Sequence, residues 1–295
     1  MGVENKLIEN KTDKKATTSF SEGRIAGISP AEQWGSEGSV PIDKEKYIIQ
    51  VKNVSRTYIQ RGRESLAVLE DINFSVKEQE FVCILGPSGC GKTTLLNILG
   101  GFVSPTSGDV CIEGIPVTEP SPRYVTIFQD YKLLPWRTVR KNIELAFEGM
   151  KQKKSRKEID ERVDAQLASV GLTRFAEFRP TEISGGMKQR VAIARALVLE
   201  PKILFMDEPF GALDAMTRDD MRHKYRLLLK ESGQTMVMVT HDVNEAIFFA
   251  DKIMIMHTSP GRIACTLDIS LPENRDVFTP EFHEIRNEIY AYLHK

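Results

Sequence analysis

A short apolar run, a glycine-rich loop and a helix-forming segment constrain the fold of this chain more than any other feature. The run covers residues 81–85, and the loop and helix start read Gly86-Pro87-Ser88-Gly89-Cys90-Gly91-Lys92-Thr93-Thr94. Glycines let backbone N–H groups converge on phosphate oxygens, and the start of a helix adds positive potential. The spacing Gly-x4-Gly-Lys-Thr between a strand and a helix therefore predicts a nucleoside-phosphate site in an α/β fold.

Four side chains have the chemistry that phosphoryl transfer requires. Lys92 is expected to reach the β- and γ-phosphates as a compact cation, and the Thr93 hydroxyl to bind Mg²⁺. A second apolar run at 203–207 ends at Asp207 and is followed by Glu208. Asp207 is predicted to hold Mg²⁺ directly or through water, and Glu208 to orient or deprotonate the attacking water.

Two further polar residues follow predicted strands. Gln129 comes after the strand at 124–128, and His241 comes after the strand at 235–240. A lone polar residue at a strand end is usually just a polar terminus, but in a parallel sheet the carboxyl ends of the strands line the ligand crevice. There Gln129 is expected to contact Mg²⁺ or water, and His241 to hydrogen-bond the γ-phosphate. With Lys92 and Glu208, these two residues form the set of catalytic candidates.

The composition is that of an ordinary globular protein of 295 residues, with 41% hydrophobic and 27% charged residues. The formal net charge of −1 gives no electrostatic reason to expect a nucleic-acid partner. No apolar run approaches the length of a membrane span, and the first residues lack the apolar core of a secretory signal. The four cysteines form no Cys-x-x-Cys pair, which favours a reducing compartment. Cys90 is either a small residue that fits a tight loop or a thiol that makes ATP binding redox-sensitive.

Alternating strand and helix patterns divide the chain. Residues 1–46 are polar and without periodicity, so we expect a disordered or loosely attached extension there. Residues 47–270 alternate strands with helices, which predicts a parallel sheet flanked by helices. A charged helical stretch at about 131–182 interrupts the alternation and is interpreted as an inserted helical subdomain. Residues 271–295 are expected to form a tail with one helix.

The segment Ser184-Gly185-Gly186-Met187-Lys188-Gln189-Arg190 lies between the phosphate loop and the acidic strand end. A serine and two glycines at a helix start form an anion site, although a phosphate loop already exists about 90 positions earlier. Together with Gln129, Asp207-Glu208, Ala212-Leu213-Asp214 and His241 in this order, the segment makes residues 47 to about 265 resemble ATP-binding cassette (ABC) ATPases. Ile183 and Met187 replace the Leu and Gln of the family's common Leu-Ser-Gly-Gly-Gln form.

The resemblance implies a fold, ligands and a dimer. It implies a P-loop NTPase with a RecA-like parallel-sheet core, an N-terminal antiparallel β subdomain and an inserted helical subdomain, binding ATP and Mg²⁺. Tyr58 would stack on adenine, unless it is an ordinary surface tyrosine. Ser184, Gly185 and Gly186 would bind the ATP of a second copy in a head-to-tail dimer, and Asp214 would organise the contact between the two sites.

Three segments resemble, more narrowly, the ATPase subunits of bacterial importers for nitrate, sulfonates, taurine and related small solutes. They are residues 133–139, 187–190 and 210–218. This resemblance implies that closure of the dimer on ATP drives separate membrane permease subunits, served indirectly by a solute-binding protein. The chain would lie peripherally on the cytoplasmic face of the bacterial inner membrane.

A cluster of apolar residues follows Gln129. It contains Leu133, Leu134 and Trp136, which would form a docking groove for a cytoplasmic helix of the permease, or else pack inside the helical subdomain.

Two alternatives remain open at this stage, namely the ATPase of an ABC exporter and a soluble, non-transport ABC protein. Soluble relatives in DNA maintenance separate the phosphate loop from the second glycine segment by a very long coiled coil, which this chain lacks. The region at 124–145 resembles importers more than exporters, but it does not exclude an exporter.

Overall fold

The computed structural model describes residues 47–59, 65–148, 150, 154–210, 215–258 and 260–293. The predicted extension at 1–46 and Asp214 lie outside the described residues. The strands are β1 (Ile49–Tyr58), β2 (Leu66–Val76), β3 (Phe81–Leu85), β4 (Ser107–Ile112), β5 (Ile115–Pro116), β6 (Tyr124–Ile127), β7 (Ile203–Asp207), β8 (Thr235–Thr240), β9 (Lys252–His257) and β10 (Arg262–Asp268). The helices are α1 (Lys92–Leu99), α2 (Val139–Glu144), α3 (Arg156–Ser169), α4 (Gly185–Leu197), α5 (Ala215–Glu231), α6 (Val243–Phe249) and α7 (Pro280–Leu293), with short 3-10 turns η1 (Leu145–Phe147), η2 (Thr173–Phe175) and η3 (Pro180–Glu182).

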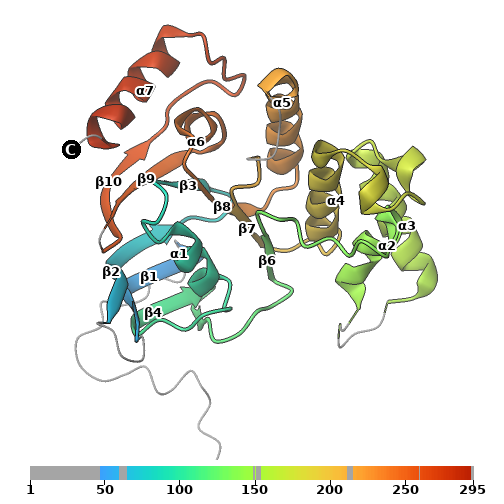
Figure 1. Cartoon of the computed structure of the whole chain (residues 1–295), viewed down its shortest axis with the longest axis horizontal. Helices are drawn as coiled ribbons and strands as arrows, with labels where there is room; N and C mark the ends of the chain where they lie inside the picture. The colour runs from blue at the N-terminus through green and yellow to red at the C-terminus, as the bar shows by residue number, and fades with distance from the viewer. Residues whose placement is uncertain are drawn as a thin grey trace, which may run out of the picture. The chain divides into compact units, whose positions relative to one another are not determined.

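A six-stranded sheet in the order β10-β9-β3-β8-β7-β6 forms the centre of the fold (Figure 1). β3 pairs in parallel with both β8 and β9, and β7 pairs in parallel with β6 and β8. Every residue of β3, β7 and β8 is buried, as expected for parallel strands that are covered on both faces. The carboxyl ends of β3, β6, β7 and β8 therefore meet along one edge of the sheet.

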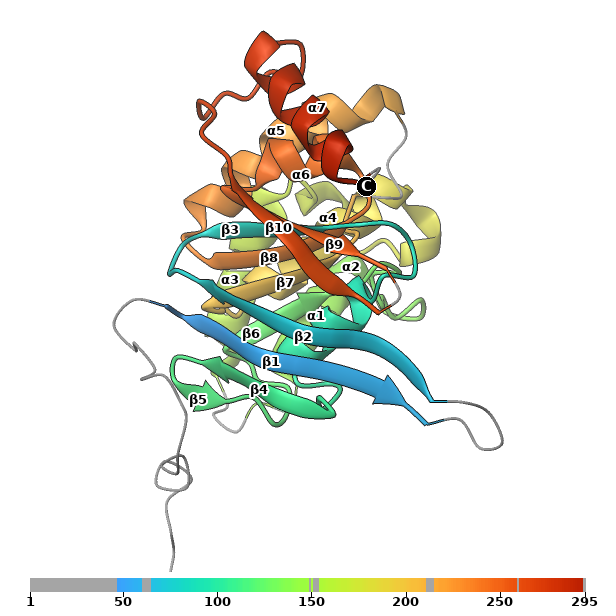
Figure 2. The same cartoon turned by 90° about the vertical axis from the view of Figure 1, so that its left-hand side faces the viewer.

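A separate four-stranded antiparallel sheet, in the order β2-β1-β4-β5, packs beside α1 (Figure 2). β1 continues past Val51 through a polar stretch to Tyr58. Its pairing register shifts after Val51, and Asn53 adopts a left-handed φ of 49°. This bulge lets the strand continue through a polar stretch that reads as a strand end.

Two hydrophobic clusters cover the two faces of the six-stranded sheet. One contains residues of α4, α5, α6 and α7, with Phe210 and Phe249 stacked at 4.4 Å between ring centroids. The other joins α1 and the antiparallel sheet to the opposite face and includes Phe205. The predicted α/β fold with parallel core, antiparallel β subdomain and helical insertion is thus confirmed.

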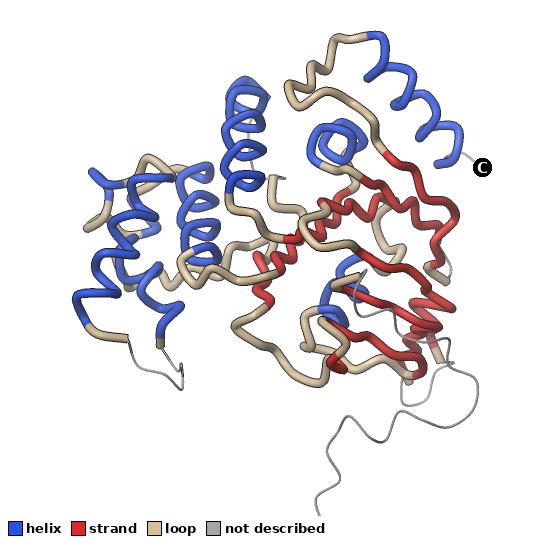
Figure 3. Tube along the Cα trace, turned by 180° about the vertical axis from the view of Figure 1, so that it is seen from behind, coloured by secondary structure: helices blue, strands red, loops and turns tan. Residues whose placement is uncertain are grey.

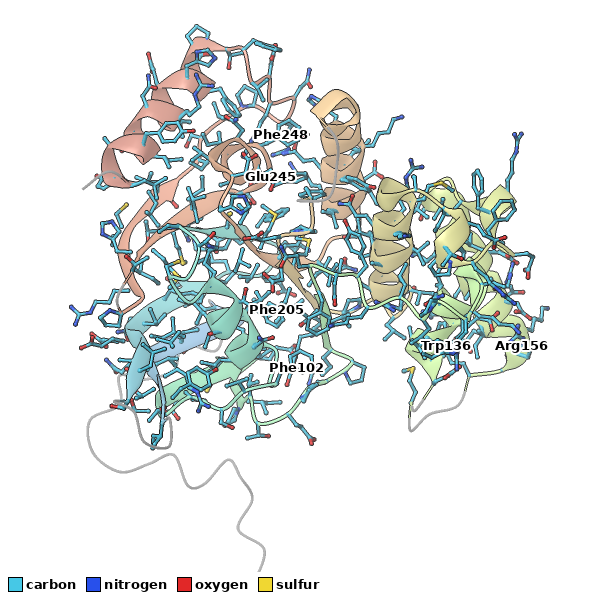
Figure 4. The ribbon with its side chains drawn as sticks, in the orientation of Figure 1. Phe102, Trp136, Arg156, Phe205, Glu245 and Phe248 are labelled. Carbon is cyan, nitrogen blue, oxygen red and sulfur yellow. The ribbon has the colours of Figure 1, made fainter. Side chains whose placement is uncertain are left out.

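The helices α2, α3 and α4 share a third cluster, built around Val139, Ile143, Val163 and Leu167. The tube view in Figure 3 shows these helices gathered beyond the β6 end of the sheet. Figure 4 places Trp136 and Arg156 in this helical group, apart from Phe205 and Glu245. Ion pairs such as Arg156–Glu144 and Arg140–Asp160 lie on its surface, as expected for a charged helical stretch.

β10 and the residues that follow it pack against the six-stranded sheet and α6. Sequence patterns alone do not reveal these contacts. β10 pairs antiparallel with β9 and alternates exposed and half-buried residues, as an outer strand does. Beyond it, Arg275 is 3% exposed and donates to the carbonyl oxygens of Ile247 and Ala250, at the end of α6. Arg226 of α5 donates to the carbonyl of Phe248, so two arginines satisfy the last carbonyls of α6.

Candidate functional site

The loop between β3 and α1 has the curvature of a phosphate-binding loop. Gly89 and Gly91 adopt left-handed φ values of 82° and 96°, which side chains disfavour. The Lys92 Nζ donates to the carbonyl oxygens of Gly86 at 2.7 Å and Pro87 at 2.9 Å. The lysine therefore extends back along the inside of the loop. Gly91 precedes α1 and no side chain caps this helix, so its first N–H groups have no side-chain acceptor there.

Close packing also explains why glycine is required at positions 86 and 91. A Cβ atom on Gly86 would lie 2.8 Å from the Met256 carbonyl oxygen, and one on Gly91 would lie 2.7 Å from Leu69 Cδ2. Gly89, in contrast, has open space where its Cβ would be. The base of the loop is therefore held against β2 and β9, whereas the side of Gly89 faces open space.

Thr93 and Asp207 bring two oxygen ligands together at the sheet edge. The Thr93 hydroxyl donates to Asp207 Oδ1 at 3.2 Å, and Asp207 is only 6% exposed. Burial raises the pKa of the Asp207 carboxyl, and the neighbouring Glu208 adds to this, while the Thr93 hydrogen bond and Lys92 act in the opposite direction. A bound cation would offset the desolvation of this carboxylate.

This pair of oxygens fits Mg²⁺. No group of three or more His, Cys, Asp or Glu side chains gathers into a metal site within the described ranges. Mg²⁺ is typically held by one or two carboxylates together with substrate phosphates, so a hydroxyl and one carboxylate are the donor set that it needs from the protein. Thr93 and Asp207, two of the three expected metal contacts, thus lie together, whereas Gln129 bonds Glu208.

Glu208 lies between two polar side chains from neighbouring strand ends. Gln129 Nε2 donates to Glu208 Oε2 at 3.2 Å, and His241 Nδ1 lies 3.0 Å from Glu208 Oε1. The Glu208 side chain is 18% exposed and His241 is 55% exposed, so the group opens to solvent. Glu208 also adopts a left-handed φ of 44°, a conformation that non-glycine residues take at some energetic cost and that is frequent at functional sites.

The remaining predicted ligand residues lie on other elements. Tyr58 ends β1 half-buried, with the Arg56 guanidinium carbon 4.5 Å from its ring centroid. Ser184 caps α4 and accepts a hydrogen bond from Met187 N at 3.3 Å, with Gly185 exposed beside it. Ser184 and the two glycines thus begin α4 on the helical group rather than beside Thr93.

Cys90 is a buried part of the loop. It is 1% exposed, and its Sγ lies 4.0 Å from Lys92 Nζ. Burial raises the pKa of the Cys90 thiol, although Lys92 lowers it in part, which disfavours the reactive thiolate. The geometry supports a small residue that fits a tight loop.

Sequence analysis does not identify two residues whose side chains hold the backbone that follows Gln129. Arg195 of α4 donates to the carbonyl oxygens of Tyr131 and Lys132, two residues in left-handed conformation just after Gln129. Asn142 is fully buried, and its amide bonds the backbone of Leu134 from both sides. No sequence pattern marks either contact, because both join side chains to distant backbone groups.

The apolar residues after Gln129 divide between core and surface. Leu133 packs partly against two hydrophobic clusters. Trp136 is 69% exposed, so it does not pack inside the helical group. Among the described helices, none combines the length and the apolar content that crossing a membrane requires.

Comparisons with known proteins agree with this geometry. A model of the family described as "ABC transporter" matches residues 69–211. The nitrate import ATP-binding protein NrtD of Synechococcus elongatus is 43% identical over 238 residues, which cover 79% of this chain and 87% of that relative. The bicarbonate transport ATP-binding protein CmpD of Synechocystis sp. is 40% identical, with 85% and 90% covered. NrtC of S. elongatus is 41% identical, but the matched region spans only 38% of its length.

A solved structure has the same fold. The ATP-binding cassette MJ0796, in a dimeric post-hydrolysis state bound to ADP and Pi, superposes with a TM-score of 0.67. It is 35% identical in sequence, and the match covers 76% of this chain and all of that one. The predicted resemblance and ATP-hydrolysing activity are confirmed by these comparisons, and the chain belongs to the family of ABC transporter ATP-binding proteins.

Proposed function

We propose that this chain is the ATP-hydrolysing subunit of an importer for a small solute, with bicarbonate added to the nitrate, sulfonates and taurine that the sequence resemblance suggests. The names of NrtD and CmpD, a nitrate import and a bicarbonate transport ATP-binding protein, support the predicted importer class. They do not favour the exporter or the soluble alternative. The observation that carries the chemistry is the Glu208 carboxylate, held between Gln129 and His241 beside the Thr93–Asp207 pair.

The loop residues bind the phosphates of ATP in this proposal. The backbone N–H groups of residues 86–94 and the Lys92 ammonium face the phosphate oxygens, and Tyr58 stacks on adenine. Thr93, Asp207 and Gln129 would hold Mg²⁺. When bound, Mg²⁺ neutralises the charge that develops on the transferred phosphoryl group.

Glu208 acts as the general base. Its carboxylate accepts a proton from the attacking water, whose oxygen forms the new bond to the γ-phosphorus as the bond to ADP breaks. The contacts with Gln129 and His241 fix both carboxylate oxygens, so that the base is oriented before the reaction. His241, whose side chain is exposed, donates a hydrogen bond to the γ-phosphate in this proposal.

In this proposal, closure of the dimer on ATP transmits the free energy of ATP binding to the permease. Ser184, Gly185 and Gly186 begin α4 on the helical group and bind the ATP of a second copy, with Asp214 at the contact between the sites. MJ0796 offers a dimeric precedent for such an arrangement. Trp136, largely exposed beside the Asn142-supported backbone, contacts the permease. The complex lies on the cytoplasmic face of the bacterial inner membrane and receives its solute from a binding protein.

The test replaces the chromosomal gene with a Lys92→Ala copy and follows uptake of labelled nitrate, bicarbonate and taurine. Loss of uptake of one solute, with normal uptake of the others, supports the importer and identifies its solute. Normal uptake of all of them, together with intact ATP hydrolysis by the purified wild-type chain, contradicts the importer for these solutes. The purified Lys92→Ala chain is the control that ties hydrolysis to the phosphate loop.

A further inference from the structure

Gly261, which lies just before β10, packs directly against the phosphate loop. A Cβ atom on Gly261 would lie 2.1 Å from the carbonyl oxygen of Cys90, and 3.0 Å from the Val68 carbonyl oxygen. A side chain does not fit at such distances unless a backbone group moves. Gly261 is not in the left-handed region, so the requirement for glycine comes from this close approach and not from the backbone angle.

Gly261 is anchored on its other side. Its N–H donates to Val68 O at 2.9 Å, and its carbonyl accepts from Glu70 N at 3.0 Å. Leu69, the residue between these two, is 1% exposed. Its Cδ2 atom would lie 2.7 Å from a Cβ atom added to Gly91. Because strand β2 holds the turn by two hydrogen bonds, a new side chain on Gly261 displaces the loop carbonyl more readily than the turn.

The orientation of the Cys90 carbonyl fixes the direction of the Gly91 N–H. The peptide bond between Cys90 and Gly91 is planar, and in a trans peptide the C=O and the following N–H point in opposite directions. Gly261 packs behind the carbonyl oxygen, which fixes the Gly91 N–H on the opposite side. This N–H precedes α1, where no side chain caps the helix.

We propose that Gly261 is a positioning residue for the phosphate loop, which sets the orientation of the Cys90–Gly91 peptide and thereby the aim of the Gly91 N–H at a nucleotide phosphate. The proposal rests on the proposed function, in which this loop binds ATP. It assigns a role in nucleotide binding to a residue about 170 positions from the loop.

The test measures binding of ADP with Mg²⁺ by titration calorimetry, the KM and kcat of ATP hydrolysis, and thermal unfolding without nucleotide. In Gly261→Ala, the Kd for ADP and the KM are expected to rise about ten- to a hundredfold, as for the loss of one hydrogen bond to a charged group. Gly233→Ala is the matched control. Gly233 has a φ of 68° with open space at its Cβ position, so alanine strains the backbone far from the loop and leaves the Kd unchanged.

A second variant covers the case in which Gly261→Ala does not fold. Pro260→Gly adds backbone freedom to the same turn without adding atoms, and about a two- to fivefold increase in Kd is expected from the entropy of the loosened turn. The proposal is overturned if Gly261→Ala, or Pro260→Gly where the former is unfolded, lowers the unfolding temperature but leaves Kd and KM at wild-type values. Failure of the wild-type chain to bind ADP would instead contradict the proposed function itself.

Discussion

Thr93 donates a hydrogen bond of 3.2 Å to Asp207, a residue 114 positions later in the chain. The contact joins the first turn of α1 to the end of the fully buried strand β7. It exists because β7 and β3 are both paired in parallel with β8, so that their carboxyl ends emerge on the same side of the sheet. One hydroxyl and one buried carboxylate are thereby held at a distance that suits a shared cation.

Asp207 is expected to lower the stability of the nucleotide-free protein at neutral pH. Its pKa is raised in the folded state, chiefly by burial, so the folded protein binds this proton more tightly than the unfolded chain does. The stability gained from protonation is present at low pH and is lost as the pH rises through the folded pKa. We expect Asp207→Asn to raise the unfolding temperature at pH 8 by about 2–4 °C, the shift that roughly 1 kcal/mol gives in a domain of this size.

The same variant is expected to lose ATP hydrolysis, because an amide does not replace a carboxylate as a Mg²⁺ ligand. Thermal unfolding of both proteins in chelator at pH 4 and pH 8 checks the stability part. The difference between them is expected to shrink at pH 4, and an Asp207→Asn protein that is less stable than wild type at pH 8 contradicts the argument.

Glu208→Gln is expected to lower the kcat of ATP hydrolysis by about 10²–10⁴-fold, the usual range for removing a general base. The amide keeps the size of the side chain, so ATP binding persists and the variant accumulates as an ATP-bound dimer in size-exclusion chromatography. Glu200→Gln is the matched control, since Glu200 also has a left-handed φ, of 51°, but pairs with Arg162 on the surface. Hydrolysis by Glu208→Gln at the wild-type rate would remove the catalytic assignment.

Tyr58 is expected to contribute to nucleotide affinity through its ring. Stacking on a base is worth about 1–3 kcal/mol, so Tyr58→Ala is predicted to raise the Kd for ADP by about five- to a hundredfold. Tyr58→Phe retains the ring beneath Arg56 and is expected to bind nearly as wild type. Equal Kd values for all three proteins, measured by fluorescence titration, would leave Tyr58 as an ordinary surface tyrosine.

Arg275 is predicted to be important for stability although it is far from the phosphate loop in sequence. Burial, followed by the charge of Arg226, lowers the pKa of Arg275 to about 10, and its guanidinium bonds two carbonyl groups at the end of α6. Arg275→Met leaves these carbonyls without a donor, at a cost of about 2–4 kcal/mol. Denaturant unfolding is the measurement, with the exposed Arg174 changed to Met as a control that stays within about 0.5 kcal/mol of wild type.

The parts of the fold that follow from local spacing could be predicted from the sequence. The loop before Lys92, the strand that ends at Asp207 and the helix that begins near Ser184 each depend on neighbouring residues, and each is where the pattern indicates. The proximity of Gln129 and His241 to Glu208 also follows, since both come after parallel strands of one sheet.

The remaining features depend on contacts between distant residues. β1 continues to Tyr58 because a bulge at Asn53 is accommodated by pairing with β2, which no local pattern reveals. Residues 262–268 alternate weakly and form a strand only because β9 offers an antiparallel edge. Gly261 reads as an ordinary turn glycine after Pro260, and its contact with Cys90 becomes visible only in three dimensions.

The place of β3 in the sheet has a consequence for how this molecule can move. β3 is fully buried and has parallel partners on both sides, so its hydrogen bonds open only when much of the domain unfolds. Its amide protons are therefore among the slowest to exchange with solvent, and the loop that it carries serves as a fixed reference point. We therefore expect larger displacements in α2 and α3, whose buried apolar residues lie in the third cluster, whereas α4 also packs on the sheet.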